Sequence, residues 1–143
     1  MLKSLLWVSS LAAAASLLLA ASTAHGASYV TTGGVVVDPI QYNPLVASTG
    51  DHSYSGTNLG PGANLSSAFL NGADLTGADL TNTNLLLAQF FRAWLIGADL
   101  TSATATATNF ERADLTSANL TGANLAGADL ERATLTDLSL IHI

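Results

Sequence analysis

A large apolar residue returns at every fifth position from Leu65 to Leu140, and this period restricts the fold more than any other feature of the chain. Ala105 is the one small residue in the series, and it keeps the phase. Two positions before these residues stands an alanine almost every time, with Thr83, Thr108 and Leu138 as the exceptions. An unbroken phase over this length indicates a repeat architecture.

A five-residue period fits neither of the regular secondary structures. In an α-helix, five residues turn the chain by about 500°, so successive leucines would stand about 140° apart around the axis. In a long strand, an offset of five residues would place successive leucines on opposite faces. The period therefore predicts short extended segments joined by bends, in which the alanine and the leucine of each segment face a common interior.

The outward residues indicate how many segments complete one turn of the coil. The pair Glu111-Arg112 returns as Glu131-Arg132, and Arg92 precedes Arg112 by the same interval. That interval holds four of the five-residue segments, so we expect a four-sided coil with about four coils in total.

Several units share one short motif. Residues 73–77 read Ala-Asp-Leu-Thr-Gly, and residues 118–122 and 123–127 are close variants. They resemble the A(D/N)LXX signature of the pentapeptide-repeat family, and the chain is similar to its exported bacterial members. The resemblance covers residues 61–140 and implies an all-β fold, a right-handed quadrilateral β-helix. The period alone does not fix the hand.

Residues 1–26 have the pattern of a secretory signal peptide. Lys3 supplies a positive start, residues 5–21 are apolar or small, and Ala-His-Gly at 24–26 fits a cleavage site before Ala27. The alternative is an uncleaved membrane anchor, but such a segment is marginal for crossing about 30 Å of hydrocarbon. We expect an exported protein in the periplasm, the extracellular space or a thylakoid lumen, without stable membrane insertion once residues 1–26 are removed.

The remaining chain divides into three parts. Residues 27–60 lack the repeat and predict an irregular N-terminal arm that partly caps the first coil, with one short strand at residues 35–37. The β-helix follows at residues 61–140, and residues 141–143 form a tail.

The C-terminal coil is expected to be open. It would present unpaired backbone groups and the apolar side chains of Leu135, Leu138 and Leu140. Some members of the resembled family close this end by stacking two copies, which implies a homodimer through the C-terminal coil.

Charge and composition argue against several functions. The formal net charge is −6, and an acidic chain is repelled by phosphate, so we expect no direct nucleic-acid binding. The chain has no cysteine, and its histidines, His25, His52 and His142, are too far apart for a metal-ligand pattern. Stacked carboxylates such as Asp79 and Asp99 are explained by regular corner polarity. We therefore predict no catalytic residues, no metal site, no cofactor and no enzymatic activity.

Two sets of outward residues depart from the polar pattern. Leu86, Leu87, Phe91, Trp94 and Ile96 form an apolar set within one coil, which either binds a protein partner or is covered in part by the N-terminal arm.

The second set is a column of charged residues: Arg92, Glu111, Arg112, Glu131 and Arg132. We interpret it as a solvated ion-pair ladder rather than an anion-binding strip, with each pair contributing at most about 1 kcal/mol.

These features predict an exported, non-enzymatic structural or protein-interaction module with an unidentified protein partner. The alternative, implied by the resemblance, is a DNA-mimicking protein that binds DNA gyrase. Acidity favours that alternative, whereas export and the small number of coils oppose it.

Overall fold

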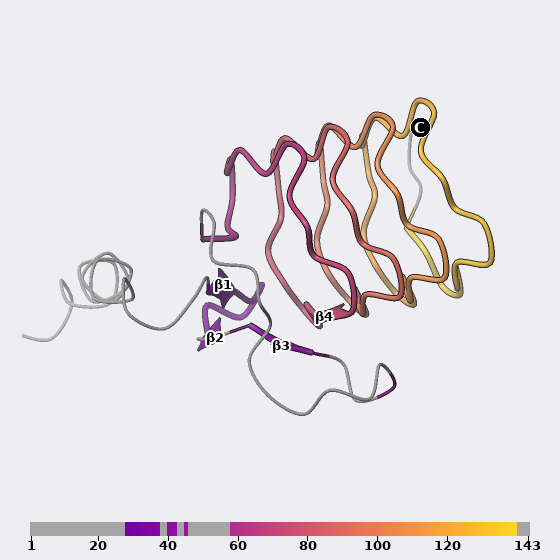
Figure 1. Cartoon of the computed structure of the whole chain (residues 1–143). Coiled ribbons are helices and arrows are strands. Elements are labelled where there is room, and N and C mark those ends of the chain that lie inside the picture. The colour runs from indigo at the N-terminus through magenta and orange to yellow at the C-terminus, as the bar shows by residue number, and fades with distance from the viewer. Residues whose placement is uncertain (1–27, 38–39, 43–44, 46–57, 140–143) are drawn as a thin grey trace, which may run out of the picture.

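The computed structural model describes residues 28–37, 40–42, 45 and 58–139, which Figure 1 shows in colour. The predicted signal peptide, Leu140 and the tail lie outside the described residues. Residues 58–139 wind into a stack of coils, and the strands of the N-terminal arm lie at the end of the stack where the winding begins (Figure 1).

The stack has four sides, and each side is a column of outward residues that parallel β-bridges join from one coil to the next. The first side carries Asn64, Asn84, Thr104 and Asn124, the second Phe69, Gln89, Asn109 and Asp129, the third Asp74, Trp94, Asp114 and Thr134, and the fourth Asp79, Asp99, Asn119 and Ser139. The four-sided coil predicted from the sequence is therefore present.

Backbone hydrogen bonds join each side of a coil to the same side of the coil before it. The N–H of Gln89 donates to the carbonyl of Ala68 at 2.8 Å, and the carbonyl of Gln89 accepts from the N–H of Leu70 at 2.8 Å. The pattern repeats down the stack, so every interior coil is bonded on both sides. The sheet is wound on itself, and its exposed edges are confined to the two ends.

The chain bends at each corner because the last residue of each unit takes a left-handed backbone conformation. Ten residues other than glycine have φ between 52° and 60° at these corners. The carbonyl of Leu65 accepts from the N–H of Ala68 at 3.0 Å across one such bend. The side chain ahead of the leucine supports the bend, as where Asp74 Oδ1 accepts from the N–H of Thr76 at 3.1 Å. This local bond explains why Asp and Asn precede the central leucine so often.

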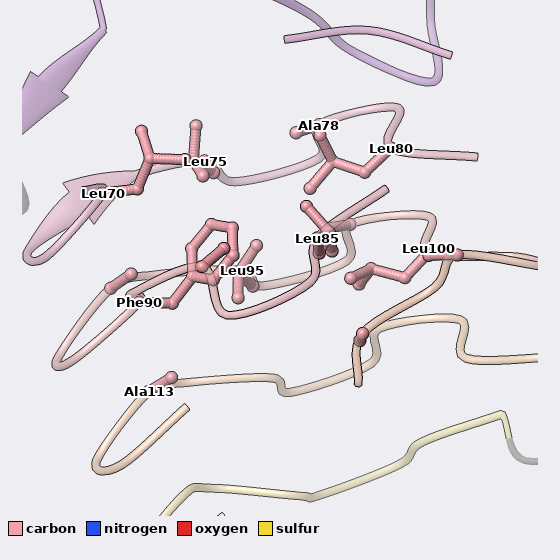
Figure 2. Close-up of a cluster of buried hydrophobic side chains, with 14 of the residues drawn as sticks. Leu70, Leu75, Ala78, Leu80, Leu85, Phe90, Leu95, Leu100 and Ala113 are labelled. Atoms are coloured by element: carbon pink, nitrogen blue, oxygen red, sulfur yellow. The ribbon is translucent and has the colours of Figure 1, made fainter. Parts of the chain in front are cut away.

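The leucine, phenylalanine and alanine positions fill the interior of the coils (Figure 2). Phe90 and Phe110, one above the other, stack with ring centroids 5.3 Å apart and planes 12° apart. Full burial of each such side chain contributes about 1.5–3 kcal/mol. Thr108 occupies an alanine position, and its buried hydroxyl donates to the carbonyl of Leu85 at 2.7 Å, so its polarity is satisfied.

Three short strands of the N-terminal arm lie against the first coil. β1 (Tyr29–Val30) and β2 (Val36–Val37) pair with each other in antiparallel fashion. β3 (Gln41–Tyr42) pairs antiparallel with β4 (Ala73–Asp74), which belongs to the first coil. The strand expected at residues 35–37 is present as β2.

The described part of the arm is a partial cap bound to the coil by backbone bonds and by burial. The N–H of Asp79 donates to the carbonyl of Val30 at 2.7 Å. Tyr29, Ile40 and Leu59 are buried and extend the core beyond the first coil. The bend geometry of the repeats also begins here, because the carbonyl of Gly60 accepts from Ala63 N–H at 3.0 Å as the central leucines do in later units.

The last described coil is less buried than the interior coils. Leu95 and Leu115 are fully buried, whereas Leu135 in the same column is 44% exposed. Leu125 and Leu130 are only partly buried. Among the described residues, no backbone carbonyl accepts from the N–H groups of Leu125, Leu130 and Leu135. This coil therefore presents an uncovered apolar and hydrogen-bonding rim within the described part of the chain.

Candidate protein-binding surface

Leu86 and Leu87 form the corner between the first and second sides in the second coil. They are 39% and 51% exposed. Leu87 has a φ of 60°, a conformation that costs a residue with a Cβ atom about 1 kcal/mol. A leucine that is half exposed and has a left-handed backbone conformation contributes little to the stability of the fold. This corner is therefore a candidate surface for contact with another protein.

Phe91 lies at the next corner of the same coil, between the second and third sides. The guanidinium carbons of Arg92 and Arg112 lie 5.2 Å and 5.8 Å from the centre of its ring. Two cations over one aromatic ring give cation–π attraction on the order of 0.5–1 kcal/mol each at an exposed site. Phe91 therefore lies beside two guanidinium groups, one of which also pairs with Glu111.

Trp94 and Ile96 lie further around the coil. Trp94 is on the third side, where β-bridges place it between Asp74 and Asp114. Ile96 follows at the corner between the third and fourth sides, and its carbonyl accepts from Gly77 N–H at 2.8 Å. Both side chains are partly buried. The five apolar residues selected from the sequence thus extend around the coil, and only Leu86, Leu87 and Phe91 border one side.

Phe69, which the sequence argument did not select, completes the apolar surface on the second side. It is 69% exposed and lies directly before Gln89 in its column. Most units carry Asp, Asn or Thr at this position. Aligning the sequence coil by coil would have revealed Phe69 between the corners of Leu87 and Phe91. We call Phe69, Leu86, Leu87 and Phe91 the apolar surface.

The described part of the N-terminal arm contacts other sides of the first coil. Its backbone pairings are with Leu59, with β4, with Gly77 and with Ala78 and Asp79. None of these pairings involves residues 86–91. The alternative that the arm covers residues 86–91 therefore has no support in the part of the arm that the structure describes.

The charged residues of the predicted ladder lie in one corner column, between the second and third sides. Arg112 Nε is 3.5 Å from Glu111 Oε1, and Arg132 Nε is 3.6 Å from Glu131 Oε1. Both bridges join sequence neighbours within one coil. Their partly exposed side chains are screened by solvent, so each pair contributes at most about 1 kcal/mol. In the coil above, Phe91 occupies the position of the glutamate beside Arg92.

The carboxylates of the fourth side are engaged in corner hydrogen bonds. Asp79 Oδ1 accepts from both the N–H and the hydroxyl of Thr81, at 3.2 Å and 2.9 Å, and Asp99 and Thr101 repeat the arrangement. Across the described residues, no three His, Cys, Asp or Glu side chains are grouped as ligands for a metal ion.

Tyr29 is the ionisable group whose environment the cap changes most clearly. Burial, with a smaller contribution from the Asp74 carboxylate, raises the pKa of Tyr29 to about 12. Its hydroxyl donates to the carbonyl of Thr76 at 3.3 Å. The neutral phenol is thus part of the contact between the cap and the first coil. Titration of Tyr29 therefore reports whether that contact is formed.

The predicted signal peptide and the three histidines belong to segments that the structure does not describe. Residues 1–26, with His25, and also His52 and His142, lie outside the described residues. Within the described ranges, no helix is long and apolar enough to span a bilayer.

Comparison with protein families gives one match, to a model described as pentapeptide repeats, in eight copies over residues 62–93, 87–122 and 113–142. No curated protein matches the chain.

Several solved structures resemble the chain. HetL, a pentapeptide repeat protein involved in heterocyst differentiation regulation in the cyanobacterium Nostoc, is 36% identical over 64% of this chain and 44% of its own, with a TM-score of 0.46. The Nostoc pentapeptide repeat protein alr5209 is 30% identical over 55% of this chain and 81% of its own, with a TM-score of 0.50. One from the Arabidopsis thaliana thylakoid lumen is 34% identical over 55% and 59%, with a TM-score of 0.30.

The chain thus spans less than half the length of HetL. The family match and the likeness to alr5209 confirm the predicted right-handed quadrilateral β-helix.

Proposed function

Because the chain belongs to the pentapeptide-repeat family, we propose that it is a structural or protein-interaction module that acts outside the cytoplasm and catalyses no reaction. The observation that carries this proposal is the apolar surface. Phe69 and Leu87 are 69% and 51% exposed on coils whose other outward positions are mostly polar. Contiguous exposed apolar side chains on a soluble protein are typical of a binding surface.

Export is supported by the signal-peptide pattern of residues 1–26. Because the chain has no cysteine, its composition does not distinguish oxidising from reducing compartments. We therefore propose that the protein is located in the periplasm, the extracellular space or a thylakoid lumen. The Arabidopsis pentapeptide repeat protein comes from one such compartment, the thylakoid lumen.

A DNA-mimicking protein that binds gyrase is the second candidate, and the net charge of −6 is the observation in its favour. A DNA mimic needs an extended run of acidic side chains on one surface. Here the described carboxylates are spread over three sides and two corners, and the corner column that holds Glu111 and Glu131 also carries three arginines. A predicted export signal opposes it further, because gyrase acts on the chromosome.

The main proposal is tested by finding the compartment of the native protein and by crosslinking the protein that contacts its apolar surface. The native protein is fractionated, its N-terminal residue is found by mass spectrometry, and a photo-crosslinking amino acid at position 87 is irradiated in the native compartment. We expect a protein that begins at or near Ala27 and a crosslinked protein partner. A chain that retains Met1 in the cytosol and inhibits gyrase supercoiling would replace this proposal with the second one.

A further inference from the structure

The first coil has unpaired backbone groups on its first and second sides. In the interior of the stack, the N–H of Asn84 donates to the carbonyl of Ala63 at 3.0 Å, and the carbonyl of Asn84 accepts from the N–H of Leu65 at 2.8 Å. Asn64 and Phe69 are the corresponding residues of the first coil, on its first and second sides. Within the described part of the chain, neither uses its N–H or its carbonyl in a backbone hydrogen bond. Each is therefore an edge residue on its own side of the coil.

The last described coil has the complementary groups on the same two sides. On the first side, the carbonyl of Ala123 and the N–H of Leu125 have no backbone partner among the described residues. On the second side, Ala128 and Leu130 repeat this arrangement. These residues stand at the places in the repeat from which an interior coil bonds the outward residue of the next coil. The two ends of the stack therefore match each other in register.

A second copy of the chain could pair with both open sides at once. Its last described coil bends between the first and second sides as the first coil does, so it could bond Asn64 and Phe69 together, which a straight strand could not. The side chains on the first side also match. Asn84 Nδ2 donates to Asn64 Oδ1 at 3.1 Å, and Asn124 belongs to the same column. Such stacking would continue the contact that already joins successive coils of the chain.

The N-terminal arm occupies the other two sides of this edge, at the end of the stack where the winding begins (Figure 1). On the third side β3 pairs with β4, and on the fourth side the N–H of Asp79 donates to the carbonyl of Val30 at 2.7 Å. In the next coil, the N–H of Asp99 donates at 2.9 Å to Ala78 of the coil before it. The arm thus uses the groups with which a preceding coil would pair, so it competes directly with a second copy.

The apolar interior is covered at the same end. Tyr29 and Ile40 of the arm are 5% and 1% exposed, and they belong to the hydrophobic core of the first coil. Leu135 of the last described coil, which no such cap covers within the described residues, is 44% exposed. Displacement of the arm would leave apolar surface and sheet edges at both ends, and such ends tend to associate.

We propose that the N-terminal arm prevents the chain from stacking head to tail, with the last described coil of one copy on the first coil of the next. Displacement of β1 and β3 opens all four sides of the first coil to a second copy. Each added copy presents the same two ends again, so the assembly does not close and grows in length. The homodimer expected through the C-terminal coil would use the same last coil but leave the first coil free. This inference goes beyond the proposed function, because it concerns the end of the stack and not the apolar surface.

The test releases the arm in the mature chain by two substitutions, Tyr29→Asp and Ile40→Asp, which place charges at buried positions. Hydrogen exchange of the Asp79 amide should accelerate, whereas the Asn109 amide in the interior should stay protected. In analytical ultracentrifugation, the wild-type protein should remain no larger than a dimer, and the mass of the released variant should grow with concentration. Fibre diffraction of the product should show the coil spacing of about 4.7–4.9 Å along the fibre.

Variants of the edge itself separate stacking from nonspecific aggregation. Asn64→Pro removes a donor that the single chain does not use, so it should be tolerated at this edge position. In the released variant it should lower the assembled fraction at least about tenfold, because it removes a hydrogen bond and adds a clash at the junction. Asn64→Ala loses the same side-chain bonds but keeps the N–H, so it should leave assembly unchanged. Val35→Asp adds a charge to an exposed residue of the arm and should behave like the wild-type protein.

Three results would overturn the proposal. The first is a released variant that keeps its interior protection but never exceeds a dimer. The second is equal assembly with Asn64→Pro and Asn64→Ala, which would assign the association to another surface. The third is a wild-type protein that forms long assemblies while its Asp79 amide remains protected. If the double substitution also removes protection of the Asn109 amide, Ile40→Asp alone, which disturbs the arm less, is judged by the same three criteria.

Discussion

The two ends of the coil stack are built from the same repeat but are finished differently. At the N-terminal end, β1 and β3 lie on two sides of the first coil and bury Tyr29 and Ile40 against it. In the last described coil, Leu135 is 44% exposed, although Leu95 and Leu115 in its column are fully buried. The repeat therefore determines the column of a side chain, whereas the neighbouring coil or cap determines its burial.

This difference has an energetic consequence. In a stacked architecture, stability is approximately a sum over coil-to-coil contacts. A coil between two others is stabilised by two coil-to-coil contacts. An end coil has only one such contact unless a cap replaces the missing neighbour. We expect the two sides of the first coil that the arm covers to behave energetically like the interior, and the last described coil to be the weakest part of the stack.

The largest expected effect compares two leucines of one column. Leu95→Ala should lower the free energy of unfolding by about 2–5 kcal/mol, because it leaves a cavity between two coils. Leu135→Ala should cost less than about 1.5 kcal/mol, because this side chain is already partly in water. Urea denaturation followed by circular dichroism measures both. Equal losses would mean that the last coil is covered in solution.

Removal of a buried cap residue should have the next largest effect. Ile40→Ala is expected to cost about 2–3 kcal/mol, since Ile40 is buried as completely as a core leucine. Val35→Ala, at a residue that is 61% exposed, is the control and should change stability by no more than about 0.5 kcal/mol. Hydrogen exchange of the Asp79 amide should accelerate only in the Ile40 variant. A neutral Ile40→Ala variant would show that the cap contributes nothing to the end it covers.

The last described coil, whose rim no other described residue covers, extends the comparison to assembly. We propose a homodimer through this coil, and Leu135→Asp should weaken the dimer by at least about tenfold, because it places a charge in an apolar contact. Leu87→Asp, on a different part of the surface, should leave the dimer intact. Analytical ultracentrifugation across a range of concentrations distinguishes the variants, and a wild-type protein that is monomeric throughout that range would contradict the dimer.

The smallest expected effect is a dependence of stability on pH through the cap. Burial raises the pKa of Tyr29 from 10.0 to about 12, so the folded state holds its phenolic proton more tightly than the unfolded state does. This contribution is complete below pH 10 and is lost as the pH rises toward 12. Tyr29→Phe should abolish that loss while retaining the cap. Unfolding curves between pH 9 and 12 that are identical for the two proteins would contradict it.

The solenoid could be predicted from the sequence because the requirement for an inward-facing residue at every fifth position is repeated without interruption. The inward positions from Leu65 onward recur at every fifth residue, and the return of Glu111-Arg112 as Glu131-Arg132 shows the length of one coil. The packing of the cap was less accessible. Gln41 and Tyr42 lie outside the repeat. Their strand forms by pairing with Ala73 and Asp74 of the first coil, and the local sequence does not encode this distant contact.

The candidate surface was predicted only in part for a related reason. Leu86, Leu87, Phe91, Trp94 and Ile96 are close in sequence, but a coil carries successive units to different sides. Phe69 is distant in sequence and was missed, although one turn of the coil relates it to Gln89 on the same side. Surface residues of this fold must be grouped by column and side.

The five-residue unit also allows the pattern of outward residues to change while the core stays the same. Inserting one complete unit would leave every downstream leucine facing inward, since the interior pattern repeats with each unit. Every downstream outward residue would move by one side, so Arg112 would no longer lie beneath Phe91. Each insertion or deletion of a whole unit therefore shifts the downstream outward residues by one of the four sides and gives them new neighbours. The buried residues that stabilise the fold remain nearly the same.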